Sequence, residues 1–564
     1  MSDKDQWIET LQKMNTQLED QNREQAETIR ELRAMIANLQ ETLEEFKRKL
    51  FGTSSEKTGK GSSQENPGDG DQDDEEVQVG EEVQVTVKEH TRTRKPKSVR
   101  KDIYESLPVK KVYCDIPTGE RQCPDCGTEM DHLGYKYVRE ELRITPARVE
   151  RIRYYQEKLV CPACKEEMDT TIIEGKTPTP LLPHSMASPS MVATVMYEKT
   201  GLHLPFYRQE ADWDQKGAPI PRETLTNWYN TCTLKYLVPI YDLMHLIFVT
   251  ERDLIHADEV PCQVLKEPGR RPEQRSYMWV YLTGRDGKPA IILYDYQQGR
   301  AGKYPIAFLE GFSGKIHCDG YTAYGMIENV ILLCCLAHCR RKFYEAVSKN
   351  RRKYLKLLDI NSEQEIPDPG EGTAERTDLT PAEKGVVFCN RIFYKERFYK
   401  DLPAEERKEK RLGSEPQIWE EFWAWIDTLD PAGGSKLESA VNYALNHKEL
   451  LMNYLEDGRC EVSNNAAERK VKAYVMSRKA FLFHDTMEGA TATAIVLSLI
   501  ETAKANGLNA FQYLYTVLLY MPDYLDSPAG IEQLLPWSDF IQERCKGPTD
   551  VDSITPENRP KLPI

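Results

Sequence analysis

Three widely separated acidic residues have the types and positions to do chemistry together. Asp258 and Asp319 each fall at the end of a short apolar run that is typical of a β-strand, and Glu468 falls near the start of an expected helix. Carboxylates are the ligands that Mg²⁺ or Mn²⁺ prefers. Two such ions can activate an attacking oxygen and stabilise a leaving one. The pattern predicts a nuclease-like site with Asp258, Asp319 and Glu468 as catalytic residues and magnesium ligands.

Each acid also has a simpler structural interpretation. Asp258 could be a turn or cap residue, and Glu259 competes for its role. Asp319 precedes a glycine, and Asp-Gly is an ordinary turn. Glu468 could merely complement the dipole of its helix behind a capping asparagine.

Basic and polar residues near these acids are typical of a surface that neutralises DNA phosphates. One cluster follows the strand-like run 330–335, and another shares the helix of Glu468. His338 could also be a base, and His338 and His256 are as readily structural. The residues predicted to contact DNA from these two clusters are His338, Arg340, Arg341, Arg469, Lys472, Arg478 and Lys479. Arg222 and Asn227 are predicted to contact DNA from the helical run 221–229.

The elements that must position the acids form a recognisable order. Strand-like runs at 254–258, 277–284 and 290–296 include a hairpin, and a helix and a further strand lead into Asp319. This order matches the start of a ribonuclease-H-like sheet. In that fold the first acid lies on strand one, the second ends a later strand, and the third comes from a helix across the sheet.

The 148 residues between Asp319 and Glu468 exceed what such a core needs. Residues 346–457 are therefore predicted to be a helical insertion that embraces DNA or a partner subunit. Its basic run, 407–411, is interpreted as a solvated face.

Two Cys-x-x-Cys pairs, 34 residues apart, predict a structural zinc site. Tetrahedral Zn²⁺ takes four thiolates, and strand-like runs between the pairs suggest a zinc ribbon. The predicted zinc ligands are Cys123, Cys126, Cys161 and Cys164.

Residues 8–50 carry apolar residues at heptad spacing, which predicts a coiled coil and self-association. A long helix packed on its own protein is the alternative. Further along, three short helical runs at 190–199, 206–216 and 221–229 fit either a helix-turn-helix or a small helical bundle.

Composition limits the class of protein. The net charge is −15, but residues 61–90 contribute −9 of it, so the remainder is only mildly acidic. No signal peptide is apparent, and no unbroken apolar run reaches the roughly 18 residues that span a bilayer. A cytoplasmic, nucleoid-associated location without a membrane partner is expected, with the 14 cysteines reduced.

The expected architecture is multidomain α+β. Its predicted parts, in chain order, are a coiled-coil helix (1–52), an acidic disordered linker with a basic end (53–101), a zinc ribbon (102–178), a helix-turn-helix-like DNA-binding domain (179–250), the first part of a ribonuclease-H-like core (251–345), the helical insertion (346–457), the last part of the core (458–510), and a C-terminal helical segment and tail (511–564).

The motifs around the acids closely resemble those of bacterial transposases of the insertion sequence sixty-six family. They are His-Ala-Asp258-Glu, Cys-Asp319-Gly-Tyr, Ala-His338-Cys-Arg-Arg-Lys-Phe and Asn-Asn-Ala-Ala-Glu468-Arg. The resemblance implies a DDE transposase with Asp258, Asp319 and Glu468 as its triad. It also implies terminal inverted repeats and target DNA as substrates, and small accessory proteins of the same element as partners.

Two other functions stay open. A domesticated relative would bind DNA without catalysis, and a metal nuclease on the same fold would cut without joining strands. All three acids are present, which favours the transposase.

Overall fold

The computed structural model describes most of the chain after residue 148. The predicted coiled coil, the linker and the four cysteines predicted to bind zinc lie outside it. The described residues are 149–155, 157–160, 172–174, 177–348, 379–524, 529–552, 555–556 and 558–559.

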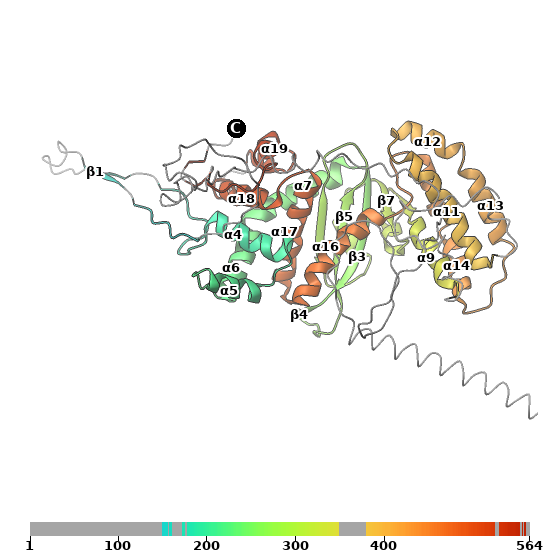
Figure 1. Cartoon of the computed structure of the whole chain (residues 1–564), viewed down its shortest axis with the longest axis horizontal. Helices are drawn as coiled ribbons and strands as arrows, with labels where there is room; N and C mark the ends of the chain where they lie inside the picture. The colour runs from blue at the N-terminus through green and yellow to red at the C-terminus, as the bar shows by residue number, and fades with distance from the viewer. Residues whose placement is uncertain are drawn as a thin grey trace, which may run out of the picture. The chain divides into compact units, whose positions relative to one another are not determined.

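A five-stranded mixed sheet lies at the centre of this part, with strand order β6-β5-β3-β7-β8 (Figure 1). The antiparallel strands are β3 (Leu254–Cys262), β5 (Ser276–Thr283) and β6 (Ile292–Gln297). β7 (Gly314–Cys318) pairs in parallel with β3, and β8 (Val330–Cys334) in parallel with β7. The predicted hairpin is confirmed as β5 and β6.

Helices cover both faces of the sheet. Val280 packs in one core with Ala467 of α16 (Asn465–Phe481) and Leu497 of α17 (Met487–Ala505). Its neighbour Trp279 packs in a second core with α7 (Val238–Glu251). Side chains alternate between the faces of a strand, so apolar residues at consecutive positions fill both cores.

A helical group precedes the sheet. It contains α4 (Pro189–Met196), which continues as the π-helix η2 (Tyr197–Gly201), and α5 (Phe206–Gln215). After a turn at Gly217, α6 (Arg222–Cys232), the π-helix η3 (Thr233–Leu237) and α7 form one 30-residue helix. The third helical run predicted at 221–229 is thus the start of a much longer helix. The C-terminal helices α18 (Ala510–Tyr520) and α19 (Asp539–Arg544) pack in the core that contains Trp279.

By length and composition alone, this 30-residue helix could cross a membrane, because an 18-residue window within it has a mean hydropathy of 1.4. About 44% of the apolar window is buried inside the protein, and the core helix of a soluble protein meets the same criterion.

A second helical group lies between β8 and α16 in sequence. Its core contains Trp419, Phe422 and Trp423. The expectation of a solvated face at 407–411 is wrong for two residues, because Arg407 and Arg411 are buried. Arg411 binds the Glu396 carboxylate at 2.6 Å. The helices are α9 (Leu336–Ala346), α11 (Pro381–Tyr399), α12 (Ala404–Leu412), α13 (Pro416–Ile426), α14 (Lys436–Asn446) and α15 (Lys448–Met452).

Several short elements complete the described chain. They are β1 (Lys158–Val160) paired with β2 (Ile172–Glu174), β4 (Val264–Lys266) paired with β9 (His484–Thr486), α8 (Lys303–Phe308), and the 3₁₀ turns η4 (Thr322–Met326), η7 (Asn453–Glu456), η8 (Met521–Asp523) and η9 (Ile531–Leu534).

Candidate active site

The register of β3 separates the two adjacent acids. Asp258 pairs with Val280, whose side chain lies in the core beneath α16, whereas Glu259 pairs with Trp279 on the opposite face. The Tyr324 hydroxyl donates a 3.0 Å hydrogen bond to Glu259 from that opposite side. Only Asp258 of this pair therefore shares a face of the sheet with α16.

Asp258 lies where three other carboxylates act on it. Burial, followed by the charge of Glu259 and then those of Asp319 and Glu468, raises the Asp258 pKa to about 7. The backbone N–H of Glu259 partly opposes this shift by donating a 2.8 Å hydrogen bond to Asp258. The charges of Asp319 and Glu468 thus both act on Asp258.

Asp319 follows β7 in a turn that helix α14 supports. The Asp319 carboxylate accepts a 2.9 Å hydrogen bond from the N–H of Tyr321, and its carbonyl accepts one of 2.9 Å from the Tyr443 hydroxyl. Gly320 has φ of +93°, and a Cβ there would lie 2.6 Å from Nε2 of His447. Only glycine fits both this backbone conformation and this close approach.

Glu468 lies in the first turn of α16, and Asn464 fixes the start of that helix. The Asn464 side chain accepts a 3.0 Å hydrogen bond from Nδ1 of His256 and donates one of 2.9 Å to the Ala257 carbonyl. Its backbone N–H lies 3.1 Å from the Cys335 sulfur. Asn464 therefore ties the helix to β3, and its side chain makes no capping bond.

His256 has a structural role in this arrangement. Its ring stacks on that of His317, the partner residue on β7, with centroids 4.3 Å apart. Burial lowers the pKa of both imidazoles, so both are neutral at ordinary pH. The stack joins the two strands that carry Asp258 and Asp319.

Arg300 was not foreseen from the sequence. Its guanidinium binds Glu259 at 2.5 Å, lies 3.9 Å from Asp319, and stacks on the Tyr321 ring at 4.1 Å. It follows β6 in an unremarkable Gly-Arg loop, so no local pattern marked it. Arg300 neutralises the acid that faces away from α16.

A family model described as transposase IS66 family matches residues 184–492, more than half of the chain. The chain belongs to the IS66 transposase family. Further models match residues 120–165, as the zinc-finger binding domain of transposase IS66; 498–537, as the IS66 C-terminal element; and 38–112, as transposase C of IS166 homeodomain. The resemblance noted in the sequence is confirmed, and the zinc-finger match, which contains all four predicted cysteine ligands, supports zinc binding.

Proteins of Sinorhizobium fredii are similar to this IS66 family chain. Uncharacterized protein y4hP is 26% identical over 89% of this chain and 88% of its own length. Uncharacterized protein y4jD is 26% identical, covering 75% and 79% respectively, and y4qI is 28% identical, covering 65% of each. No solved structure matches the chain significantly.

Within this IS66 family structure, Glu468 is turned towards α9. Its carboxylate lies 3.4 Å from Arg341 and 3.8 Å from Nδ1 of His338. In the described residues, Cys335, His338 and Glu468 are the set whose possible ligand atoms all lie within 4.8 Å of one another. Asp258 and Asp319 are not in that set.

The predicted DNA-binding residues divide into exposed and engaged side chains. Arg469, Lys472 and Lys479 are exposed on α16. Arg340 donates to Asn390 of α11 at 2.7 Å, and Arg478 donates to the Pro261 carbonyl.

The two residues predicted from the helix-turn-helix pattern lie on α6, far from the acids in sequence. Arg222 is exposed and lies 3.4 Å from Glu210 of α5. Asn227 is exposed and accepts a 3.2 Å hydrogen bond from Thr231.

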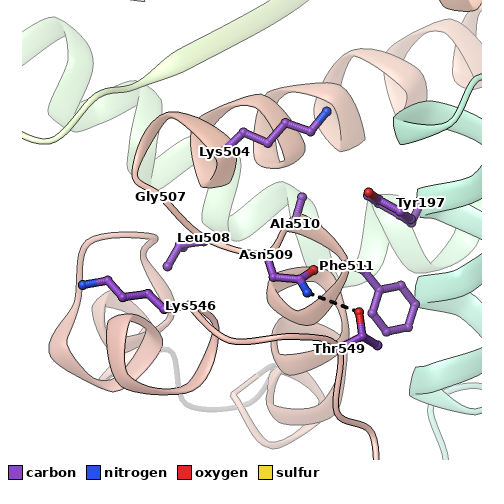
Figure 2. Close-up of a pocket in the computed structure, with 9 residues that line it drawn as sticks. All are labelled: Tyr197, Lys504, Gly507, Leu508, Asn509, Ala510, Phe511, Lys546 and Thr549. Atoms are coloured by element: carbon purple, nitrogen blue, oxygen red, sulfur yellow. Dashed lines mark hydrogen bonds between the residues drawn. The ribbon is translucent and has the colours of Figure 1, made fainter. Parts of the chain in front are cut away.

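A cavity of about 560 Å³ lies away from these acids, where α17 meets α18 (Figure 2). Asn509 donates to Thr549 across it at 3.2 Å, and Lys504 beside it is paired with Glu501 at 3.0 Å. None of the predicted site residues lines this cavity.

Proposed function

We propose that this chain is a DDE transposase that binds the terminal inverted repeats of an insertion sequence and catalyses metal-dependent strand cleavage and strand transfer. The observation that carries the proposal is the convergence of Asp258, Asp319 and Glu468 from β3, the end of β7 and α16. Membership of the IS66 transposase family supports the same reaction class.

The catalytic core is ribonuclease-H-like in this proposal. Three antiparallel strands followed by two parallel ones, with the second acid after the fourth strand in sequence and the third acid on a helix across the sheet, support that assignment.

The acids fit divalent cations. They offer hard oxygen ligands. Burial, and after it the charges of the neighbouring carboxylates, raise the Asp258 pKa to about 7, so a cation would relieve the repulsion between these groups. Asp258, Asp319 and Glu468 would hold two Mg²⁺ or Mn²⁺ ions, which supply activation of the attacking oxygen and charge stabilisation at the leaving one. The turn at Gly320 and the Asn464 contacts orient two of the acids before any ligand arrives.

DNA contacts follow from charge. The helix of Glu468 exposes Arg469, Lys472 and Lys479, which would neutralise phosphates beside the acids. Arg341 lies beside the Glu468 carboxylate and could contact the same phosphates. Zinc held by the four cysteines, self-association through the heptads, accessory proteins of the same element and a cytoplasmic location complete the proposal.

A strand-transfer assay tests it. Full-length protein, Mg²⁺ or Mn²⁺, a labelled duplex carrying the element's end and a plasmid target are compared with Asp319→Asn and Glu468→Gln. Glu488→Gln, an exposed acid at the start of α17, is the matched control.

Joined product in the wild type and in Glu488→Gln, but in neither site variant, is the expected result. Cleavage without joining would instead identify a nuclease. DNA binding without cleavage, even with the accessory proteins added, would identify a non-catalytic relative.

A further inference from the structure

The side chains of Cys335, His338 and Glu468 form a compact cluster whose chemistry differs from that of the three acids. Their possible ligand atoms lie within 4.8 Å of one another. Cys335 and His338 are three residues apart at the start of α9, so both project from one helical turn, and Glu468 reaches them from α16. A thiol, an imidazole and a carboxylate are ligands that Zn²⁺ accepts together, whereas Mg²⁺ avoids sulfur.

One ring nitrogen of His338 lacks a hydrogen-bond partner. Nδ1 of His338 is buried without a hydrogen-bond partner, 3.8 Å from Glu468. Its Nε2 faces the Arg341 guanidinium at 3.2 Å, and because arginine only donates, Nε2 accepts and the proton of the neutral ring is on Nδ1. A buried donor without a partner is costly, so this nitrogen lies in a place suited to a ligand.

The surroundings of the cluster also suit a bound cation. The backbone N–H of Asn464 donates to the Cys335 sulfur at 3.1 Å, a contact that orients a metal-binding thiolate. The Glu468 side chain is 33% exposed, so its side of the cluster is open to solvent for a water ligand in the fourth tetrahedral position.

We propose that Cys335, His338 and Glu468 form a Zn²⁺ site that is separate from the cysteine ribbon. Binding releases the Cys335 thiol proton to solvent, moves the imidazole proton to Nε2, and displaces Arg341, whose half-exposed side chain can turn outward. The regulatory consequence rests on the proposed function. A Glu468 carboxylate bound to zinc is withdrawn from Asp258 and Asp319, so zinc inhibits strand transfer in the presence of Mg²⁺.

The zinc content of the reduced full-length chain tests the site without reference to activity. It is measured at buffered free Zn²⁺ with excess Mg²⁺. Cys335→Ser, His338→Gln and Glu468→Gln should each weaken binding of one zinc by about tenfold or more, because each removes a direct ligand. Cys232→Ser, another buried thiol on α6, is the control and should leave the zinc content unchanged. Arg341→Gln should tighten binding, because it removes the competing cation.

His338 and Glu468 are partly exposed, so their variants keep the test decisive if Cys335→Ser fails to fold. Equal zinc binding by the wild type and by folded His338→Gln and Glu468→Gln would overturn the site.

Strand-transfer activity distinguishes the zinc proposal from the proposed transposase function. Zinc inhibition of wild-type strand transfer that Cys335→Ser relieves is expected. Inhibition that persists in folded Cys335→Ser would overturn the regulatory role. A chain that binds this zinc but never joins DNA would keep the site and remove the proposed transposase function.

Discussion

Gly320 shows how a single residue sets the position of an acid. Its φ of +93° and the proximity of His447 both exclude a side chain. We expect Gly320→Ala to destabilise the fold by about 1–3 kcal/mol and to abolish strand transfer, because the Asp319 turn must move. Thermal unfolding and the strand-transfer assay measure the two effects.

Gly311 is a matched control for that change. Its φ is +88°, yet nothing lies within 4 Å of a Cβ placed there. Gly311→Ala therefore carries the backbone strain without the clash. Equal loss of activity in both variants would show that backbone strain, and not the His447 contact, is responsible.

Lys199 links stability to pH. It is buried between aromatic rings, 4.2 Å from the Tyr229 centroid, and its ammonium donates to Thr493 at 3.1 Å. Burial lowers its pKa from 10.5 to about 7. Between these values the unfolded chain binds a proton there that the folded chain does not, so the Lys199 contribution to stability rises with pH across this window.

Lys199→Met should remove this dependence. We expect the variant to be more stable than the wild type near pH 7.5 by up to a few kcal/mol, with the advantage shrinking towards about pH 9.5. Denaturant unfolding at both pH values measures the effect, with exposed Lys235→Met as the control. A difference in stability between the variant and the wild type that is the same at both pH values would contradict this expectation.

Among the elements, helix α16 has a buried face and an exposed basic face. Tyr474 is buried against the sheet, whereas Arg469, Lys472 and Lys479 are exposed. We expect glutamine at any one of these three positions to reduce the slope of log affinity against log salt by about 0.9, because one phosphate contact is lost. Filter-binding or anisotropy titrations across salt concentrations measure the slope.

Exposed Lys546 on the C-terminal segment is the control for this series. If Lys546→Gln lowers the slope as much as Lys472→Gln does, the exposed face of α16 is not a preferred site of contact with DNA phosphates.

The elements also show what could be predicted from sequence. Apolar runs located β3 and β7 because strand burial is a local property, but the expectation that Asp258 ends its strand is wrong, since β3 continues to Cys262. Arg300, Tyr443 and the side-chain contacts of Asn464 could not be found in this way. Tyr443 reaches Asp319 across 124 residues, and that contact depends on how the insertion packs. Burial of Arg411 likewise depends on Glu396, a partner on another helix.

At the scale of the whole molecule, self-association remains a prediction for residues 1–52. Ile36→Asp places a charge in the predicted heptad seam and should shift sedimentation towards monomer at micromolar concentration. Ala34→Asp adds the same charge off the seam and should leave the assembly intact. A wild-type monomer would contradict the coiled-coil interpretation.

The short junction between the long helix and β3 limits how these two elements can move relative to each other. The helix ends at Glu251 and β3 begins at Leu254, and between them Arg252 is buried in an ion pair with Asp286 at 3.0 Å. At 1.5 Å per residue the 30-residue helix is about 45 Å long. Because only two residues separate the helix from β3 and the first is held in a buried ion pair, we expect DNA bound at the start of the helix to lie at a fixed distance from Asp258. That distance would set how many base pairs separate the bound sequence from the cut.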